Sequence, residues 1–154
     1  MGGLATEQVI DLSAYGKMGF GETAVAQSIT QNQWTVVTNV TNDLWATSAN
    51  KLKGVSYLND TLVINKAGFY DVDAQLSVDG SASSILRLGL YVNDVLVCVC
   101  TGYQQLANNK IIQMTYVDLL ELEGNDVIKV VITNTANSNG VDAIAGKIVI
   151  RRVG

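Results

Sequence analysis

Residues 68–79 read GFYDVDAQLSVD, and this stretch decides the fold class. Apolar side chains occupy every second position from residue 70: Tyr70, Val72, Ala74, Leu76 and Val78. The positions between them are polar: Asp71, Asp73, Gln75, Ser77 and Asp79. Because successive side chains of a strand point to opposite faces, this period of two predicts a long β-strand with one buried face.

Short runs rich in Val, Ile, Thr and Tyr continue around this strand, with Asn, Asp, Gly and Ser between them, as is typical of antiparallel β proteins. Asn93-Asp94 predicts a two-residue hairpin turn, because both side chains tolerate positive φ. The pattern predicts a two-layer sandwich, and the absence of a Cys…Trp…Cys framework favours a jelly roll over an immunoglobulin domain. The predicted strands are 34–41, 53–58, 61–65, 68–79, 84–92, 95–101, 111–122, 127–134 and 143–153.

The first 33 residues differ from the rest of the chain in composition and in hydrophobic period. They are polar, contain five glycines, and show no sustained period of 2 or 3.6. Residues 22–31 are the one stretch there that suits a short helix. We therefore predict that residues 1–33 form an N-terminal arm, an anchoring segment that orders on docking, and that 34–154 form the jelly-roll domain.

The composition favours self-association. Hydrophobic residues make up 48% of the 154-residue chain and charged residues 16%, whereas charged residues usually account for about 25%. The predicted strands 95–101 and 127–134, and residues 143–150, are apolar on both faces, so each needs a second cover, which a neighbouring subunit supplies most simply. The net charge is −4 and there is no basic run, which disfavours nucleic acid and anionic membranes as partners.

No targeting signal or membrane-spanning segment is predicted. The longest apolar run, residues 95–100, is far shorter than the roughly 18 residues of a spanning helix, so we expect a soluble protein made in a cytoplasm. Cys98 and Cys100 share one face of a predicted strand. Buried free thiols are the favoured interpretation, and a metal pair or a disulfide between chains stays open.

Three stretches resemble the tumour-necrosis-factor-like jelly rolls, which include the globular heads of complement trimers. They are NDTLVINKAGFYDV at 59–72, LELEGNDVIKV at 120–130 and AGKIVI at 145–150. In the second stretch the glycine arrives one residue early. The chain also has no collagen-like repeat, signal peptide or membrane stalk, which argues against an animal cytokine or complement protein. Modules of this kind also occur in bacteriophage virions.

The resemblance implies a compact homotrimer in which one sheet of each subunit faces the threefold axis. The implied trimer-interface candidates are Asp71, Asp73, Gln75, Thr115, Val117, Ile148 and Ile150. Three copies would bring the carboxylates of Asp71 and Asp73 together, and these would repel one another unless water, protonation or a cation relieved the charge. A wet polar channel or a solvated face is the favoured interpretation. An axial Ca²⁺ site is a weaker alternative, and no metal is favoured.

The chain has no histidine and no phosphate-binding glycine loop. The commonest general base and the Ser-His and Cys-His nucleophile pairs are therefore missing, so we expect no catalytic residues, no enzyme activity and no cofactor. Exposed polar loops on a rigid sandwich often carry recognition. The recognition-loop candidates are Tyr103, Gln104, Gln105, Asn108 and Asn109.

These patterns predict a non-enzymatic structural or attachment component of a phage virion, acting as a homotrimer. A capsid head fibre, a decoration protein and a receptor-binding knob are the forms considered. Its expected partners are its own copies, virion proteins through the arm, and a host surface glycan or receptor. The alternative is a soluble trimeric lectin or a ligand of a cell-surface receptor.

Overall fold

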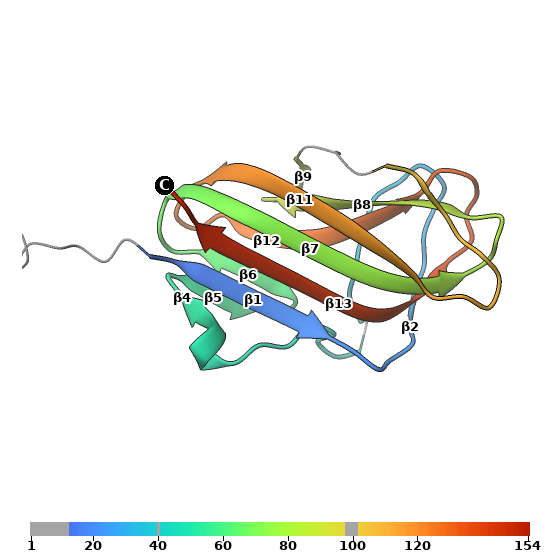
Figure 1. Cartoon of the computed structure of the whole chain (residues 1–154), viewed down its shortest axis with the longest axis horizontal. Helices are drawn as coiled ribbons and strands as arrows, with labels where there is room; N and C mark the ends of the chain where they lie inside the picture. The colour runs from blue at the N-terminus through green and yellow to red at the C-terminus, as the bar shows by residue number, and fades with distance from the viewer. Residues whose placement is uncertain (1–12, 40, 98–101) are drawn as a thin grey trace, which may run out of the picture.

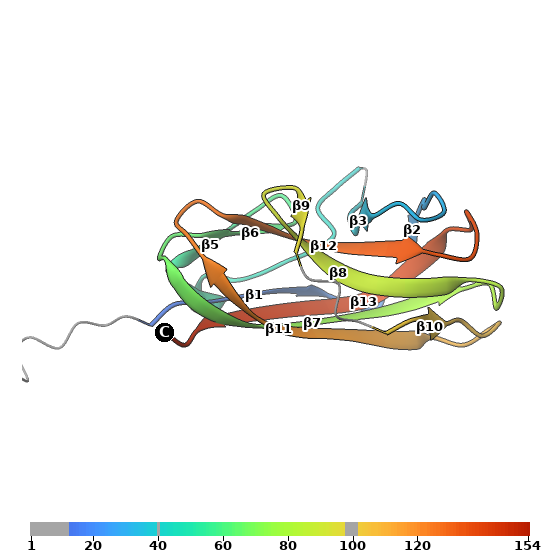
Figure 2. The ribbon, with the colours of Figure 1, turned by 90° about the horizontal axis from the view of Figure 1, so that it is seen from above.

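The computed structural model describes residues 13–39, 41–97 and 102–154 as a sandwich of two antiparallel sheets (Figures 1 and 2). Sheet A has the order β11-β7-β13-β1-β4, with β2 paired to β13. Sheet B has the order β10-β8-β12-β6-β5, with β3 paired to β12 and β9 to β8. This arrangement confirms the predicted all-β, two-layer fold.

The strands of sheet A are β1 (Tyr15–Phe20), β2 (Val25–Gln27), β4 (Leu52–Lys53), β7 (Gly68–Gly80), β11 (Ile112–Leu122) and β13 (Val141–Arg152). The strands of sheet B are β3 (Thr35–Val36), β5 (Val55–Leu58), β6 (Thr61–Ile64), β8 (Ile85–Val92), β9 (Val95–Leu96), β10 (Gln104–Gln105) and β12 (Val127–Asn134). A short 3-10 helix, η1 (Ala49–Lys51), precedes β4.

The core lies between the sheets and is closed within one chain. The alternating apolar side chains of β7 are at most 1% exposed, as its sequence period predicts. They pack against Leu86, Leu88 and Leu90 of β8 and Ile128, Val130 and Ile132 of β12, which are equally buried. Burying a side chain of this size stabilises a fold by about 1.5–3 kcal/mol, so these facing strands supply most of the hydrophobic stabilisation.

A buried carboxylate fastens the loop that leads into β4. Asp60 is 4% exposed, and its Oδ atoms accept hydrogen bonds from the backbone N–H groups of Leu44 (3.1 Å) and Trp45 (2.7 Å). The Thr38 hydroxyl donates a third, of 2.7 Å. Since a buried charge is costly unless donors surround it, these bonds hold Thr38, Leu44 and Trp45 against the β5–β6 hairpin. The Asn59-Asp60 turn of that hairpin has positive φ at both residues.

The outer face of sheet B is covered by the same chain. The Trp34 ring and the Leu96 side chain lie over Gly89, where an added Cβ would stand 3.0 Å from the ring and 3.3 Å from Leu96. Val131 on β12 pairs with Gly89 and is fully buried. The expectation that a neighbouring subunit supplies the second cover of 127–134 is therefore wrong at Val131, which one chain buries by itself. Glycine permits the cover, because any side chain at position 89 would displace the indole.

The described part of the predicted arm belongs to the sandwich. Residues 15–20 form β1, which pairs with β13 along its whole length, and Met18 is fully buried. Residues 25–27 form β2 on the same partner, within the 22–31 stretch that suited a short helix. The boundary predicted between residues 33 and 34 is thus wrong, since pairing with β13 organises this segment despite its weak apolar period. Residues 1–12 lie outside the described residues.

The hairpin prediction at Asn93-Asp94 is confirmed. The two residues have φ of 52° and 62°, and they connect β8 to β9. Only Val95 and Leu96 of the predicted 95–101 strand form β9. Cys98 and Cys100 lie outside the described residues, together with the predictions made for them.

The two ends of the sandwich differ. Ser13 and Gly154 line one shared hollow, at the end where β1 begins and β13 finishes (Figure 1). The 81–84 turn and the 102–110 and 135–140 loops lie at the opposite end (Figure 1). We call these the terminal end and the loop end.

Candidate subunit interface

The outer face of sheet A carries the predicted interface residues in cross-strand rows. Asp73 of β7 lies between Val117 of β11 and Val149 of β13. The next row towards the terminal end has Asp71 between Leu119 and Arg151. In antiparallel strands, residues directly opposite each other point to the same side, so each row forms a continuous strip across the sheet.

Aliphatic side chains on this face are open to solvent. Val117 is 67% exposed and Leu119 is 55% exposed, both on the edge strand β11. Phe69 at the start of β7 is 45% exposed. Nothing in the described part of the chain covers these side chains as Trp34 covers sheet B. A grouped, uncovered apolar surface of this kind is typical of a contact site for another molecule.

A hollow of about 330 Å³ lies on this face at the terminal end. Its lining residues are Asp71, Val72, Asp73, Val117, Val149 and Arg151. The Oδ1 atom of Asp73 is buried and has no hydrogen-bond partner. A buried carboxylate oxygen without a donor is destabilised by about 1–3 kcal/mol or more. The site therefore favours a ligand or partner that brings a donor or a positive charge.

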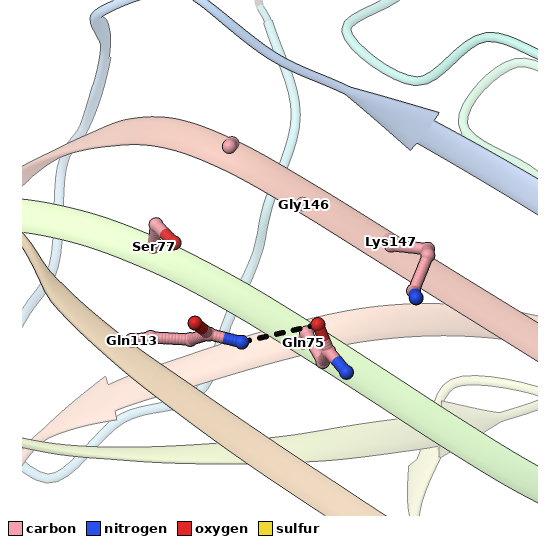
Figure 3. Close-up of a pocket in the computed structure, with 6 residues that line it drawn as sticks. Gln75, Ser77, Gln113, Gly146 and Lys147 are labelled. Atoms are coloured by element: carbon pink, nitrogen blue, oxygen red, sulfur yellow. Dashed lines mark hydrogen bonds between the residues drawn. The ribbon is translucent and has the colours of Figure 1, made fainter.

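A second hollow, of about 220 Å³, continues along the same face towards the loop end (Figure 3). It is lined by Gln75, Ser77, Gln113, Ala145, Gly146 and Lys147. The Gln113 side-chain amide donates a 3.0 Å hydrogen bond to Oε1 of Gln75, across β11 and β7 (Figure 3). This part of the face is polar and neutral except for Lys147, which projects from β13.

The structure places five of the seven interface candidates on this face: Asp71, Asp73, Gln75, Thr115 and Val117. Ile148 and Ile150 are fully buried on the core side of β13, so they are not available to a partner. A β-bulge between Ala143 and Ala145 sets this alternation, and it turns Lys147, Val149 and Arg151 outward. Sequence reasoning missed these three residues of the face, as it missed Leu119 and Phe69.

The predicted recognition loop lies at the loop end. Tyr103 is 67% exposed, and the Arg87 guanidinium carbon lies 4.6 Å from its ring centroid. Gln104 and Gln105 form β10, which pairs with β8. The cation–π contact and the strand pairing hold the aromatic ring in a fixed position at the surface.

Amide side chains fasten this loop to its neighbours. Asn108 Oδ1 accepts a 2.9 Å hydrogen bond from the Ala82 N–H, and Asn109 has a φ of 59°.

A second asparagine anchors the 135–140 loop. Asn134 is fully buried, and its side-chain amide donates to Asn137 and to the Asn139 backbone. Sequence reasoning missed Asn134, although an asparagine that ends an apolar strand is a signal for such a loop anchor.

Burial controls the ionisation of one tyrosine behind the interface face. Tyr116 is 1% exposed, and its hydroxyl donates a 2.6 Å hydrogen bond to Asp118. Burial, followed by this hydrogen bond and the negative charge of Asp118, raises the pKa of Tyr116 well above its usual range. The phenol therefore stays neutral, as its place in the core requires.

Within residues 13–39, 41–97 and 102–154, no group of three or more Cys, Asp or Glu side chains is arranged to hold a metal ion. No helix in these ranges is long and apolar enough to cross a membrane. The axial cation at Asp71 and Asp73 stays a prediction.

Solved structures share this architecture. No protein-family model matches the chain, and no curated protein matches its sequence. Eiger TNF from S. frugiperda superposes with a TM-score of 0.61 at 14% identity, covering 92% of this chain and 94% of that one. Murine APRIL at pH 5.0 gives 0.59 at 10% identity, covering 92% and 99%. The PRD1 vertex protein P5 gives 0.57 at 14% identity, covering 92% and 97%.

The fold is therefore a tumour-necrosis-factor-like jelly roll. It is shared with a phage vertex protein as well as with TNF-family structures, as the sequence resemblance predicts.

Proposed function

We propose that this chain is a non-enzymatic, homotrimeric component of a phage virion that has a structural or attachment role. The observation that carries the proposal is the uncovered outer face of sheet A, with Val117 and Leu119 exposed beside the unpartnered Asp73 carboxylate oxygen. The tumour-necrosis-factor-like resemblance implies a trimer in which one sheet of each subunit faces the threefold axis, which supports this face as the interface. The fold shared with a phage vertex protein over 92% of the chain supports the virion setting.

The arrangement of the termini and the loops at opposite ends of the sandwich suits a module that is attached at one end. The start of β1 and the end of β13 lie at the terminal end, whereas the Tyr103 loop lies at the loop end (Figure 1). Of the arm predicted to dock on virion proteins, only residues 1–12 lie before the described part of the sandwich. A module held through these residues would present the loop end outward, in the manner of a head fibre, decoration protein or receptor-binding knob.

A soluble trimeric lectin or receptor ligand is the second candidate. It is favoured by the fixed, exposed Tyr103 ring, because aromatic faces offer apolar surface to the CH groups of sugars. Eiger TNF and murine APRIL share the fold, and neither is described as part of a virus particle. Both candidates use the same trimer, so they differ in where the protein resides and in what its loop end binds.

The mass in solution tests the shared part of both candidates. Light scattering at micromolar concentration should give three times the 16.4 kDa of one chain. A mass of one chain would overturn the trimer and both candidates with it.

Experiments on purified virions distinguish the two candidate functions. Electron microscopy of purified virions with an antibody to this chain should label one class of position, and a variant without residues 1–12 should stay folded but fail to incorporate. Unlabelled particles, combined with strong signals on a glycan array that Tyr103→Ala removes, would favour the lectin.

A further inference from the structure

The outward charges of sheet A separate by sign across its width. On the strands β11 and β7 the outward charged residues are Asp71, Asp73, Asp79 and Glu121. On β13, β1 and β4 they are Lys17, Lys53, Lys147 and Arg151, with Asp142 beside Asp79 at the loop end. We call the outward side of β11 and β7 the acidic half, and the outward side of β13, β1 and β4 the basic half.

The central charges of the two halves are not paired with each other. In the part of the chain that the structure describes, no ion pair joins Asp71 or Asp73 to Lys147 or Arg151. Asp71 and Arg151 are nevertheless cross-strand neighbours. The buried Oδ1 of Asp73 lacks any donor, although the basic half begins one strand away. These charges are therefore available to a partner that approaches the face.

A closed ring of three copies brings unlike halves together. In a cyclic trimer each contact is heterologous, so one side of a subunit's face meets the other side of its neighbour's face. The charge separation on sheet A thus suits the heterologous contacts of a threefold ring, in which the acidic half of one copy meets the basic half of the next.

We propose that successive copies of this chain associate through opposite halves of sheet A. The carboxylates of Asp71 and Asp73 in one copy accept hydrogen bonds from Lys147 and Arg151 of the partner subunit, around the aliphatic contact of Val117 and Leu119. This assignment rests on the proposed homotrimer and adds the identity of the contacting halves. It also relieves the repulsion between carboxylates without an axial cation.

Charge reversal of each half tests the assignment. Asp71→Lys with Asp73→Lys makes both halves basic, and Lys147→Glu with Arg151→Glu makes both acidic. Each variant then meets like charge at every contact, so the concentration at which half the trimer has dissociated should rise at least about tenfold in low salt. Light scattering over a dilution series measures this, and circular dichroism verifies the fold. The amides Asp71→Asn and Asp73→Asn should shift dissociation in the same direction by less.

Mixing separates contacts between chains from contacts within one chain. When the two reversed variants are combined in equal amounts, two of the three contacts in a mixed trimer join unlike halves, so mass should be partly recovered. A chain carrying all four substitutions exchanges its halves and should recover the full trimer. An ion pair within one chain would be restored by the four substitutions but not by mixing.

Control variants reverse charges elsewhere: Glu22→Lys with Asp43→Lys, and Lys110→Glu. These variants should keep the dissociation midpoint of the parent. Reversed variants that remain trimeric, that do not recover on mixing, or whose assembly depends on Ca²⁺ would overturn the assigned contact while leaving the virion trimer in place. A monomeric parent chain would remove both.

Discussion

Both sheets carry apolar side chains on their outer faces, but these side chains have different surroundings. Over sheet B, Trp34 and Leu96 lie on Gly89, and the neighbouring Val131 is fully buried. Over sheet A, Val117 and Leu119 remain exposed. A doubly apolar strand therefore indicates a need for cover without saying which chain supplies it. In this molecule the open face, not the apolar pattern, identifies the surface for a partner.

The largest contrast should come from one substitution placed on each face. Val131→Asp places a carboxylate at a fully buried position beside Gly89, and it should lower the free energy of unfolding by about 4 kcal/mol or more. Val117→Asp places the same group at an exposed position, so each chain should stay folded while the trimer dissociates. Urea denaturation and light scattering together check both outcomes. Equal losses of stability in the two variants would remove the distinction between the faces.

The cover itself can be removed with a smaller effect. Trp34→Ala exposes Gly89, and should lower the free energy of unfolding by about 3 kcal/mol. Tyr103→Ala is the matched control, because it removes a more exposed aromatic ring and should cost less than about 1 kcal/mol. Thermal and urea unfolding measure both. If Trp34→Ala proves as mild as Tyr103→Ala, the cover over sheet B contributes little.

The smallest effect concerns the inward side of sheet A. Tyr116→Phe removes the hydrogen bond to Asp118 and should lower the free energy of unfolding by about 1 kcal/mol at neutral pH. The pKa of Tyr116 is higher in the folded chain than in the unfolded chain, where it is 10.0. The neutral phenol therefore stabilises the fold fully below pH 10.0, and this stabilisation is lost as the pH rises above 10.0. The difference between parent and variant should therefore narrow between about pH 9 and 11. A difference that stays constant over this interval would contradict the raised pKa.

The strands that could be predicted are those with strong periods and clear turns. The predicted 68–79, 84–92, 111–122 and 127–134 differ from β7, β8, β11 and β12 by at most one residue at either end. In these strands local pattern and tertiary position agree, because one inward face alternates along the whole strand. The polar face of β7, and with it the position of Asp71, Asp73 and Gln75, followed from the same alternation.

Strands that depend on a distant partner could not be predicted. β1 contains two glycines, and Gly16 packs so closely on Val55 that an added Cβ would lie 2.6 Å from that side chain. β2 is three residues long and pairs with β13, and of the predicted 34–41 strand β3 keeps two residues, which pair with β12. Such segments become strands because a long neighbour offers free backbone groups, a cause that single-sequence periodicity does not contain.

The β13 residues of the basic half escaped prediction because of a single irregularity. Residues 143–150 look apolar on both sides in the sequence, so the period did not identify the outward residues, and Ile148 and Ile150 were assigned to the interface instead. The bulge between Ala143 and Ala145 fixes the phase by adding one residue to β13, which turns Ile148 inward and Lys147 outward. The candidate face was thus predicted from β7 and partly from β11, but not from β13.

The shared hollow of Ser13 and Gly154 has a practical consequence for building with this sandwich. A short peptide linker could join these two positions, and new termini opened in the exposed 107–110 segment would give a circular permutant with the same strand order in space. Alternatively, a domain fused after Gly154 would project away from the Tyr103 loop. The molecule is in this sense a two-ended adaptor that can carry a cargo at one pole and display a loop at the other.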